Sequence, residues 1–194
     1  MNYTTYIHLL KSLFLRGRII SEFYSFFQNI YYCLCPYISI GHRTFLGSNI
    51  SLNVKFGGSI KIGSYCHLQN GVQLITYGGD INIGNRCSIN PYTVLYGQGN
   101  LTIGNDVRIA AHCVIIPSNH NFKDINKPIV EQGLTNKGII IQDDVWIGCG
   151  VRVLDGVTIA KGCIIGAGSV VTRSTTPYGI YVGIPAKRIK NRND

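Results

Sequence analysis

Residues 139–174 form six consecutive blocks of six residues: IIIQDD, VWIGCG, VRVLDG, VTIAKG, CIIGAG and SVVTRS. The third place of every block is Ile or Val, at positions 141, 147, 153, 159, 165 and 171. The first place is always small or β-branched. A period of six fits neither the 3.6 residues of an α-helix nor the alternation of a plain strand. It predicts an all-β solenoid in which short strands and tight corners alternate.

The same phase continues upstream. Aliphatic residues hold the third place at positions 62, 68 and 74, then at 83, 89 and 95, then at 103, 109 and 115. Each of the first two groups is followed by a short insertion, around Tyr77–Asp80 and around Gly99–Asn100. Three blocks per turn predict a triangular prism whose coils stack about 4.8 Å apart. ISIGHR and TFLGSN extend the pattern back to about Ile38, so we expect about six coils within residues 38–176.

One interruption is much longer than the others. The twenty residues from Asn119 to Gly138 separate two blocks that are otherwise in phase. Long irregular loops are uncommon in compact folds and are often functional. His120 lies almost at the base of this loop. A histidine there can take a proton from a hydroxyl near neutral pH and return it to a leaving group. An ordinary surface histidine without a catalytic role would fit the same position in the sequence.

The ends of the chain differ from the prism. Residues 1–37 place Leu, Ile and Phe at helical spacing with basic residues between them. This pattern predicts a helix that caps the open end of the solenoid, or one that lies on a membrane surface. Residues 177–194 are expected to form a C-terminal tail. Neither a signal peptide nor a spanning segment is evident, so we expect a cytoplasmic protein, with the inner face of the membrane as a possible site of contact.

The net charge and the cysteine positions limit the classes of partner and of site that this chain can have. Eighteen Lys and Arg against nine Asp and Glu give a net charge of +9, which favours an anionic partner. The cations are dispersed and no nucleic-acid reader module is visible, so nucleic acid is not expected. Seven cysteines follow no metal-binding spacing. Four of them stand two places before a core aliphatic residue, which predicts buried packing positions: Cys66, Cys87, Cys113 and Cys163.

Several motifs carry a family resemblance. The blocks VWIGCG and CIIGAG, the Asn119–His120 pair and the closing GIPAK at 183–187 resemble the hexapeptide-repeat acyltransferases. More narrowly, residues 60–190 resemble the branch of galactoside, maltose, nodulation-factor and polysaccharide O-acetyltransferases. The resemblance implies a left-handed β-helix that moves an acetyl group from acetyl-CoA to a sugar hydroxyl, in modification of a surface polysaccharide such as O-antigen or capsule. It also implies that His120 is the general base and that Asn90 binds the acceptor.

The resemblance further places acetyl-CoA along the C-terminal coils and implies a homotrimer with active sites between protomers. The implied cofactor-binding residues are Trp146, Cys149, Ala167, Thr172, Arg173 and Lys187, and a backbone N–H near Cys149 would stabilise the oxyanion. This chain departs from the pattern in two ways. Its N-terminal segment lacks the acidic acceptor contact, and its loop shows no obvious carboxylate partner for His120, which leaves Asp124 or a backbone carbonyl to orient the imidazole.

Three alternatives remain open from the sequence. The acceptor can instead be an amino sugar or a small molecule such as a streptogramin antibiotic. A zinc site like that of β-helical carbonic anhydrases would draw on His67, His112 and His120, but these lack that family's close histidine pair, so no metal is expected. A catalytically silent scaffold would bind no acetyl-CoA, and His120→Ala would leave it unchanged.

Overall fold

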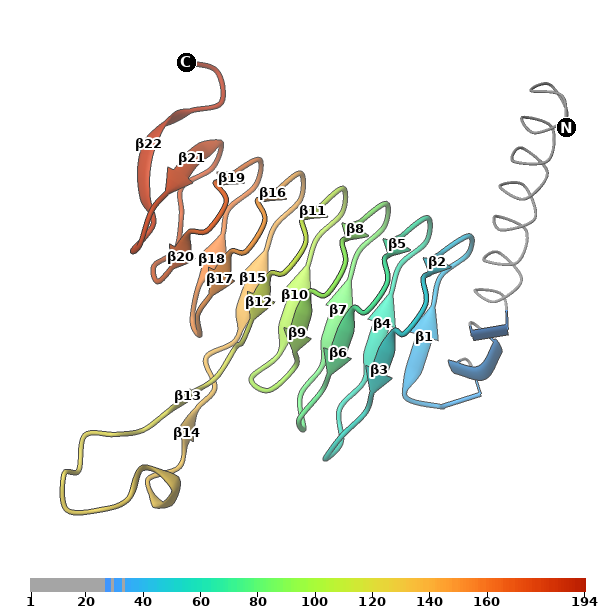
Figure 1. Ribbon diagram of the computed structural model, residues 1–194, viewed down its shortest axis with the longest axis horizontal. Coiled ribbons are helices and arrows are strands. Elements are labelled where there is room, and N and C mark those ends of the chain that lie inside the picture. Colours follow the sequence, from blue (N-terminus) through green and yellow to red (C-terminus); the bar gives the residue numbers. More distant parts are fainter. Residues whose placement is uncertain (1–26, 29, 33) are drawn as a thin grey trace, which may run out of the picture.

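The computed structural model describes residues 27, 28, 30–32 and 34–194. Nearly all of the regular structure is short β-strand, and three parallel sheets enclose one core (Figure 1). The chain visits the sheets in turn, so each coil adds one strand to each sheet. Six coils result, which confirms the prism and the coil number predicted from the six-residue period.

Sheet I contains the first strand of each coil: β1 (Ile38–Ile40), β4 (Ile60–Ile62), β7 (Ile81–Ile83), β10 (Leu101–Ile103), β15 (Ile139–Ile141) and β18 (Thr158–Ile159). Sheet III contains the third strand of each coil: β3 (Ser51–Asn53), β6 (Gln73–Ile75), β9 (Val94–Tyr96), β12 (Val114–Ile115), β17 (Arg152–Val153) and β20 (Val170–Val171). The register aligns like with like, so that Ile60, Ile81, Leu101 and Ile139 stack through the core.

Sheet II contains the second strands and two more from the C-terminus: β2 (Phe45–Leu46), β5 (His67–Leu68), β8 (Ser88–Ile89), β11 (Arg108–Ile109), β16 (Trp146–Ile147), β19 (Ile164–Ile165), β21 (Gly179–Val182) and β22 (Lys187–Asn191). Strand β21 stacks in parallel on β19, and β22 returns antiparallel to β21. Residues expected to form a C-terminal tail therefore extend this sheet. Arg192, just beyond β22, forms an ion pair with Asp144 at 2.7 Å.

The core contains the third-place aliphatic residue of every block, as the period predicted, and all of these residues are buried except Ile40 in the first coil, which is partly buried. The four block-start cysteines are buried too, which confirms their packing role. Each of these thiols donates a hydrogen bond to a carbonyl of the following turn, as Cys113 does to Gly148 at 3.1 Å. Burial raises the pKa of the Cys113 thiol, since the charged thiolate is poorly solvated there.

Connections at the three corners differ in length. The corner between sheets I and II and the corner between sheets II and III take four residues in every coil, for example 84–87 and 90–93. The corner between sheets III and I is variable, with connections 54–59, 76–80, 97–100, 116–138 and 154–157. Figure 1 shows these longer connections along one edge of the prism, and the long excursion leaves from the same edge. All of the length variation is therefore confined to corner III–I.

The predicted N-terminal helical cap lies mostly outside the described residues. Residues 27, 28 and 30–32 are helical, and the Tyr32 hydroxyl donates to the carbonyl of Ile50 at 3.0 Å. This contact attaches the last helical turn to the first coil. In the described part of the chain, no helix has the length and apolar character needed to cross a membrane.

Candidate active site

The excursion at residues 119–138 is a paired arm and not the irregular loop that the sequence suggested. Strand β13 (Asn119–His120) pairs antiparallel with β14 (Leu134–Thr135), which sets His120 opposite Leu134. The 3-10 helix η1 (Ile129–Glu131) lies at the turn of the arm. His120 is therefore held on a strand close to the prism, with an exposed side chain. This placement suits a proton-transferring group that needs both a fixed backbone and access to substrate.

Gln132 closes the arm from within. Its side-chain amide donates to the carbonyls of Asp124 and Lys127, at 2.8 and 2.9 Å, and its Oε1 accepts from the N–H of Asp124 at 3.0 Å. The Asp124 carboxylate accepts from the N–H of Asn126. Asp124 thus caps a turn, and no hydrogen bond joins its carboxylate to His120 among the residues described. Orientation of His120 by Asp124, which the sequence allowed, is not observed.

A second contact fastens the returning strand of the arm to the prism. The Asp155 carboxylate, at corner III–I of the fifth coil, accepts from the N–H groups of Lys137 and Gly138 at 2.8 and 3.0 Å. Its other oxygen lies 3.3 Å from the Thr135 hydroxyl. Nothing in the sequence pointed to Asp155, because the block VRVLDG looks like every other block. The arm is therefore anchored by a carboxylate that only the fold brings to it.

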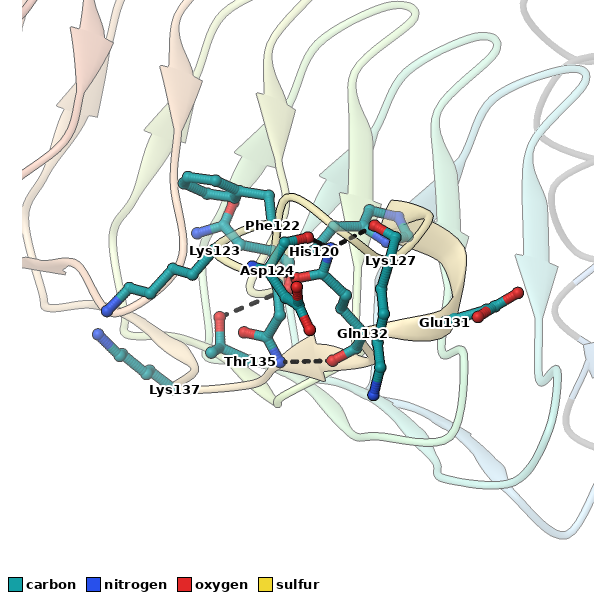
Figure 2. A pocket seen from close by; sticks show the side chains of 11 residues that line it. His120, Phe122, Lys123, Asp124, Lys127, Glu131, Gln132, Thr135 and Lys137 are labelled. Carbon is teal, nitrogen blue, oxygen red and sulfur yellow. Dashed lines mark hydrogen bonds between the residues drawn. The ribbon is translucent and has the colours of Figure 1, made fainter.

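A pocket of about 950 Å³ opens within the arm beside His120 (Figure 2). Its wall combines His120, Phe122 and Thr135 with three lysines, Lys123, Lys127 and Lys137, and with two acids, Asp124 and Glu131. The lysine excess gives the pocket a positive balance, which favours an anionic or hydroxyl-rich ligand.

Asn90 lies at a different corner of the prism. It follows β8 at corner II–III, where its Nδ2 donates to the Ile109 carbonyl at 2.8 Å. That bond fixes the amide and leaves Oδ1 without a hydrogen-bond donor among the described residues. His120 belongs to corner III–I, on the opposite side of sheet III. The structure therefore does not bring His120 and Asn90 together within one chain.

The predicted cofactor-binding residues fall into two groups. Cys149 and Ala167 are stacked at corner II–III, where the N–H of Gly168 donates to the Cys149 carbonyl at 2.8 Å. Trp146 lies on adjacent β16 and is 55% exposed, and Lys187 begins β22, just after Ala186, whose N–H donates to Val170. Thr172 and Arg173 are exposed at corner III–I, beyond β20.

Small residues line corner II–III above Asn90. In the fourth, fifth and sixth coils this corner carries Ala110 and Ala111, Gly148 and Cys149, and Gly166 and Ala167. A Cβ on Gly148 would come within 2.6 Å of the Ala167 nitrogen, so the coils approach too closely for a larger residue. The N–H of Cys149 has no acceptor among the described residues. We call this surface the small-residue rail; its small side chains and its free N–H fit a long, narrow thioester arm.

Metal-binding side chains do not gather in the part of the chain that the structure describes. His67 lies on β5, and His112 stacks on Tyr92 at corner II–III with ring centroids 5.4 Å apart. His120 lies on the arm at corner III–I. The three histidines weighed as zinc ligands are thus on different surfaces of the prism.

Comparisons with known proteins agree with this architecture. The family described as "Bacterial transferase hexapeptide (six repeats)" matches residues 138–173, and "Hexapeptide repeat of succinyl-transferase" matches residues 37–75. A dTDP-4-amino-4,6-dideoxy-D-glucose acyltransferase of Escherichia coli is 32% identical over 73% of this chain and 73% of its own length. The chain therefore belongs to the hexapeptide-repeat acyltransferases, as its motifs suggested.

Two further relatives extend the comparison. A probable acetyltransferase of Mycobacterium tuberculosis is 32% identical over 81% of this chain, but that match covers 53% of the relative, so the chain spans about half of its length. Among solved structures, the N-acyltransferase AntD of Bacillus cereus, in complex with dTDP-4-amino-4,6-dideoxyglucose and coenzyme A, superimposes with a TM-score of 0.71. That match has 25% sequence identity and covers 79% of this chain and 83% of AntD.

Proposed function

We propose that this protein transfers an acetyl group from acetyl-CoA to a hydroxyl of a sugar, in the modification of a surface polysaccharide such as O-antigen or capsule. The observation that carries the proposal is the exposed His120, held on a paired and anchored arm at the edge of a rigid prism. Membership of the acyltransferase family supplies the class of reaction. The lysine-rich pocket around His120 supports a polar acceptor.

In the proposed reaction His120 acts as general base. Its imidazole takes the proton of the acceptor hydroxyl as the hydroxyl oxygen bonds to the thioester carbon. The tetrahedral oxyanion is stabilised by a backbone N–H, for which the free N–H of Cys149 is suited. The C–S bond then breaks, the acetyl ester is left on the sugar, and the imidazolium returns its proton to the thiolate. No cysteine nucleophile is required.

The small-residue rail is the proposed site for acetyl-CoA. Cys149 and Ala167 allow the pantetheine arm to lie against the backbone, and Trp146 offers an exposed ring beside them. Lys187 and Arg188 are positioned to meet phosphates near the end of the rail, while Thr172 and Arg173 lie at the other corner of sheet III. The Asn90 amide, fixed by Ile109, keeps its Oδ1 available to a sugar hydroxyl.

A second copy of the chain is needed to complete this site, since His120 and the rail lie on opposite sides of sheet III. Two surfaces support such an assembly. Half of the outer row of sheet III is apolar: it contains Val94, Val114 and Val170 together with Ser51, Gln73 and Arg152. The matching row of sheet I has a single apolar residue, Ile140. The arm also exposes Ile125 by 93% and Val130 by 81%, which is costly unless a neighbour covers them. We propose a homotrimer in which His120 faces the rail and Asn90 of an adjacent protomer.

A second candidate function is N-acylation of an amino sugar carried by a nucleotide. It is favoured by the E. coli and B. cereus relatives, whose names specify a dTDP-linked amino sugar. The lysines around His120 suit a diphosphate as well as a polysaccharide. His120 would then remove a proton from the amine in place of the hydroxyl.

One experiment separates these functions. Release of free CoA from acetyl-CoA would be followed with a panel of sugars, dTDP-amino sugars and polysaccharide fragments, for the wild type and for His120→Ala. The proposal expects turnover with hydroxyl acceptors and a loss of about a hundredfold or more in the variant, in line with the worth of a general base. Turnover confined to amino sugars would favour the second function. Undiminished turnover in the variant would refute the role of His120, and no turnover with any acceptor would support a silent scaffold.

A further inference from the structure

A row of aromatic side chains runs along corner III–I, between the first coil and the base of the arm. Phe56, Tyr77 and Tyr96 come from the first, second and third coils, one from each connection or strand end at this corner. The ring centroids of Phe56 and Tyr77 are 6.4 Å apart, and those of Tyr77 and Tyr96 are 4.9 Å apart. We call these three residues the aromatic row. Its residues lie in, or directly before, the connections of variable length at this corner.

The row is exposed. Phe56 is 79% exposed, and Tyr77 and Tyr96 are partly exposed. The Lys55 ammonium lies over two of the rings, 5.2 Å from the centroid of Phe56 and 5.4 Å from that of Tyr77. A core role explains none of this, because the interior of each coil is already filled by its aliphatic residues. The aromatic row instead offers ring faces to the solvent, with a cation beside them.

The backbone under the row is rigid. The buried Thr76 hydroxyl accepts from the N–H of Lys55 at 2.8 Å and lies 2.7 Å from the Gly57 carbonyl oxygen. Gly58 and Gly79 allow the connections to nest, since a Cβ at either would come within about 2.1 Å of a carbonyl oxygen in the next coil. A ligand on the row would therefore meet a pre-formed platform, which reduces the entropy lost on binding.

The row leads directly to the base of the arm. Gln98, two residues after Tyr96, lies 3.3 Å from the Ser118 hydroxyl through its side-chain oxygen. A Cβ on Gly99 would lie 2.1 Å from the Pro117 oxygen and 3.1 Å from Asn136 Cα, so both ends of the arm pack against this connection. His120 follows Ser118 by two residues. The aromatic row and the candidate catalytic histidine therefore lie along one continuous edge of the prism.

Sugars match this surface. A sugar ring has a face of C–H groups, which packs on an aromatic ring, and a rim of hydroxyls, which needs hydrogen-bonding partners. Polar groups flank the row at Lys55, Gln98 and the tyrosine hydroxyls. Tyrosine hydroxyls are protonated at neutral pH and can donate hydrogen bonds, and burial together with the neighbouring Tyr77 raises the pKa of Tyr96 further. A protein partner would favour a broader apolar patch than this narrow line.

We propose that the aromatic row binds an extended acceptor, a chain of two or more sugar units whose reacting end lies at His120 and whose remainder runs toward the first coil. This inference rests on the proposed sugar acceptor and deepens it, because it selects an oligomeric or polymeric acceptor over a free monosaccharide.

The test uses bacterial capsule and O-antigen oligosaccharides of graded length, from the monosaccharide upward, with acetyl-CoA. Phe56→Ala and Tyr77→Ala are compared with the wild type and with Tyr65→Ala, an exposed tyrosine at corner I–II, as the matched control. Loss of one stacking contact is expected to raise KM about tenfold for the longer acceptors. The KM of the shortest acceptor and kcat should stay unchanged, and Tyr65→Ala should resemble the wild type. An equal effect at all lengths, or no effect, would overturn the inference.

Direct binding separates this inference from the proposed function. Wild type, Phe56→Ala and His120→Ala would be applied to an array of the same oligosaccharides without acetyl-CoA. Binding by the wild type and His120→Ala but not by Phe56→Ala supports the row even if no sugar is acetylated, in which case the proposed function alone fails. Absence of binding by the wild type to every glycan refutes the row.

Discussion

Asp155 should control the arm that carries His120. Its carboxylate accepts two backbone N–H groups, from Lys137 and Gly138, and a hydrogen bond to a charged group contributes about 1.5–3 kcal/mol. Asp155 is half-buried, so the lower figure applies to each bond, and Asp155→Ala should lower the free energy of opening of the arm by about 3 kcal/mol. That corresponds to an increase of roughly a hundredfold in the open population.

Hydrogen exchange followed by mass spectrometry measures this opening. Peptides from residues 119–138 should exchange roughly a hundredfold faster in Asp155→Ala, whereas peptides from β9 and β18 should exchange at the wild-type rate. Acetyl-CoA turnover should fall in parallel, because His120 spends more time away from its position. Global unfolding should change less than arm opening, since the prism does not depend on the arm.

Asp143 provides the matched control. Its carboxylate is also half-buried and accepts a backbone N–H across coils, from Asn105 at 2.6 Å, but at corner I–II. Asp143→Ala should reduce thermal stability without faster exchange in the arm and without a specific loss of turnover. The reasoning would be refuted if arm peptides of Asp155→Ala exchanged as slowly as in the wild type, or if Asp143→Ala opened the arm equally.

Three further measurements follow from other features. If copies of the chain cover the outer face of sheet III, Val94→Lys should reduce the mass measured by light scattering to that of one chain. Asn82→Lys, on sheet I, is the control. An unchanged mass for Val94→Lys would contradict the assembly. Exposed Cys149 should be alkylated by iodoacetamide, and acetyl-CoA should slow the reaction measured by peptide mapping; equal rates with and without it argue against the rail. Burial raises the pKa of Cys113, so its contribution to stability is present below the ordinary thiol pKa of about 8.5 and is lost as pH rises. Cys113→Ala should weaken the pH dependence of the free energy of unfolding, measured in denaturant from pH 7 upward. An unaltered pH dependence in the variant would count against this role of Cys113.

The prism was predictable because its physical cause is local in sequence. Ile141, Ile147 and Ile159 recur at a fixed interval since each coil must fill the same interior, and the same requirement makes Cys113 and Cys163 small. The break after Ile115 was visible for the same reason, because it interrupts a strict phase. Its internal pairing was not visible, since two residues at each end of a twenty-residue segment carry no periodic signal.

The parts of the site follow from contacts between coils, which the sequence reveals poorly. Asp155 is seventeen to twenty residues from the groups it binds, and its block resembles the others. The family resemblance made Asn90 and His120 partners acting from neighbouring chains, and three corners per coil do place them on opposite sides of sheet III within one chain. Phe56, Tyr77 and Tyr96 did leave a trace, since their spacings of 21 and 19 match the length of a coil.

Because length variation is restricted to corner III–I, the part of the fold that shapes the rail is separate from the part that varies around the acceptor. Corners I–II and II–III, with four residues per coil, set the stacking of the coils and thus the shape of the rail. Extra residues at corner III–I project outward and leave those hydrogen bonds in place. Changes in acceptor preference can therefore arise by insertion at this edge without disturbing the thioester side.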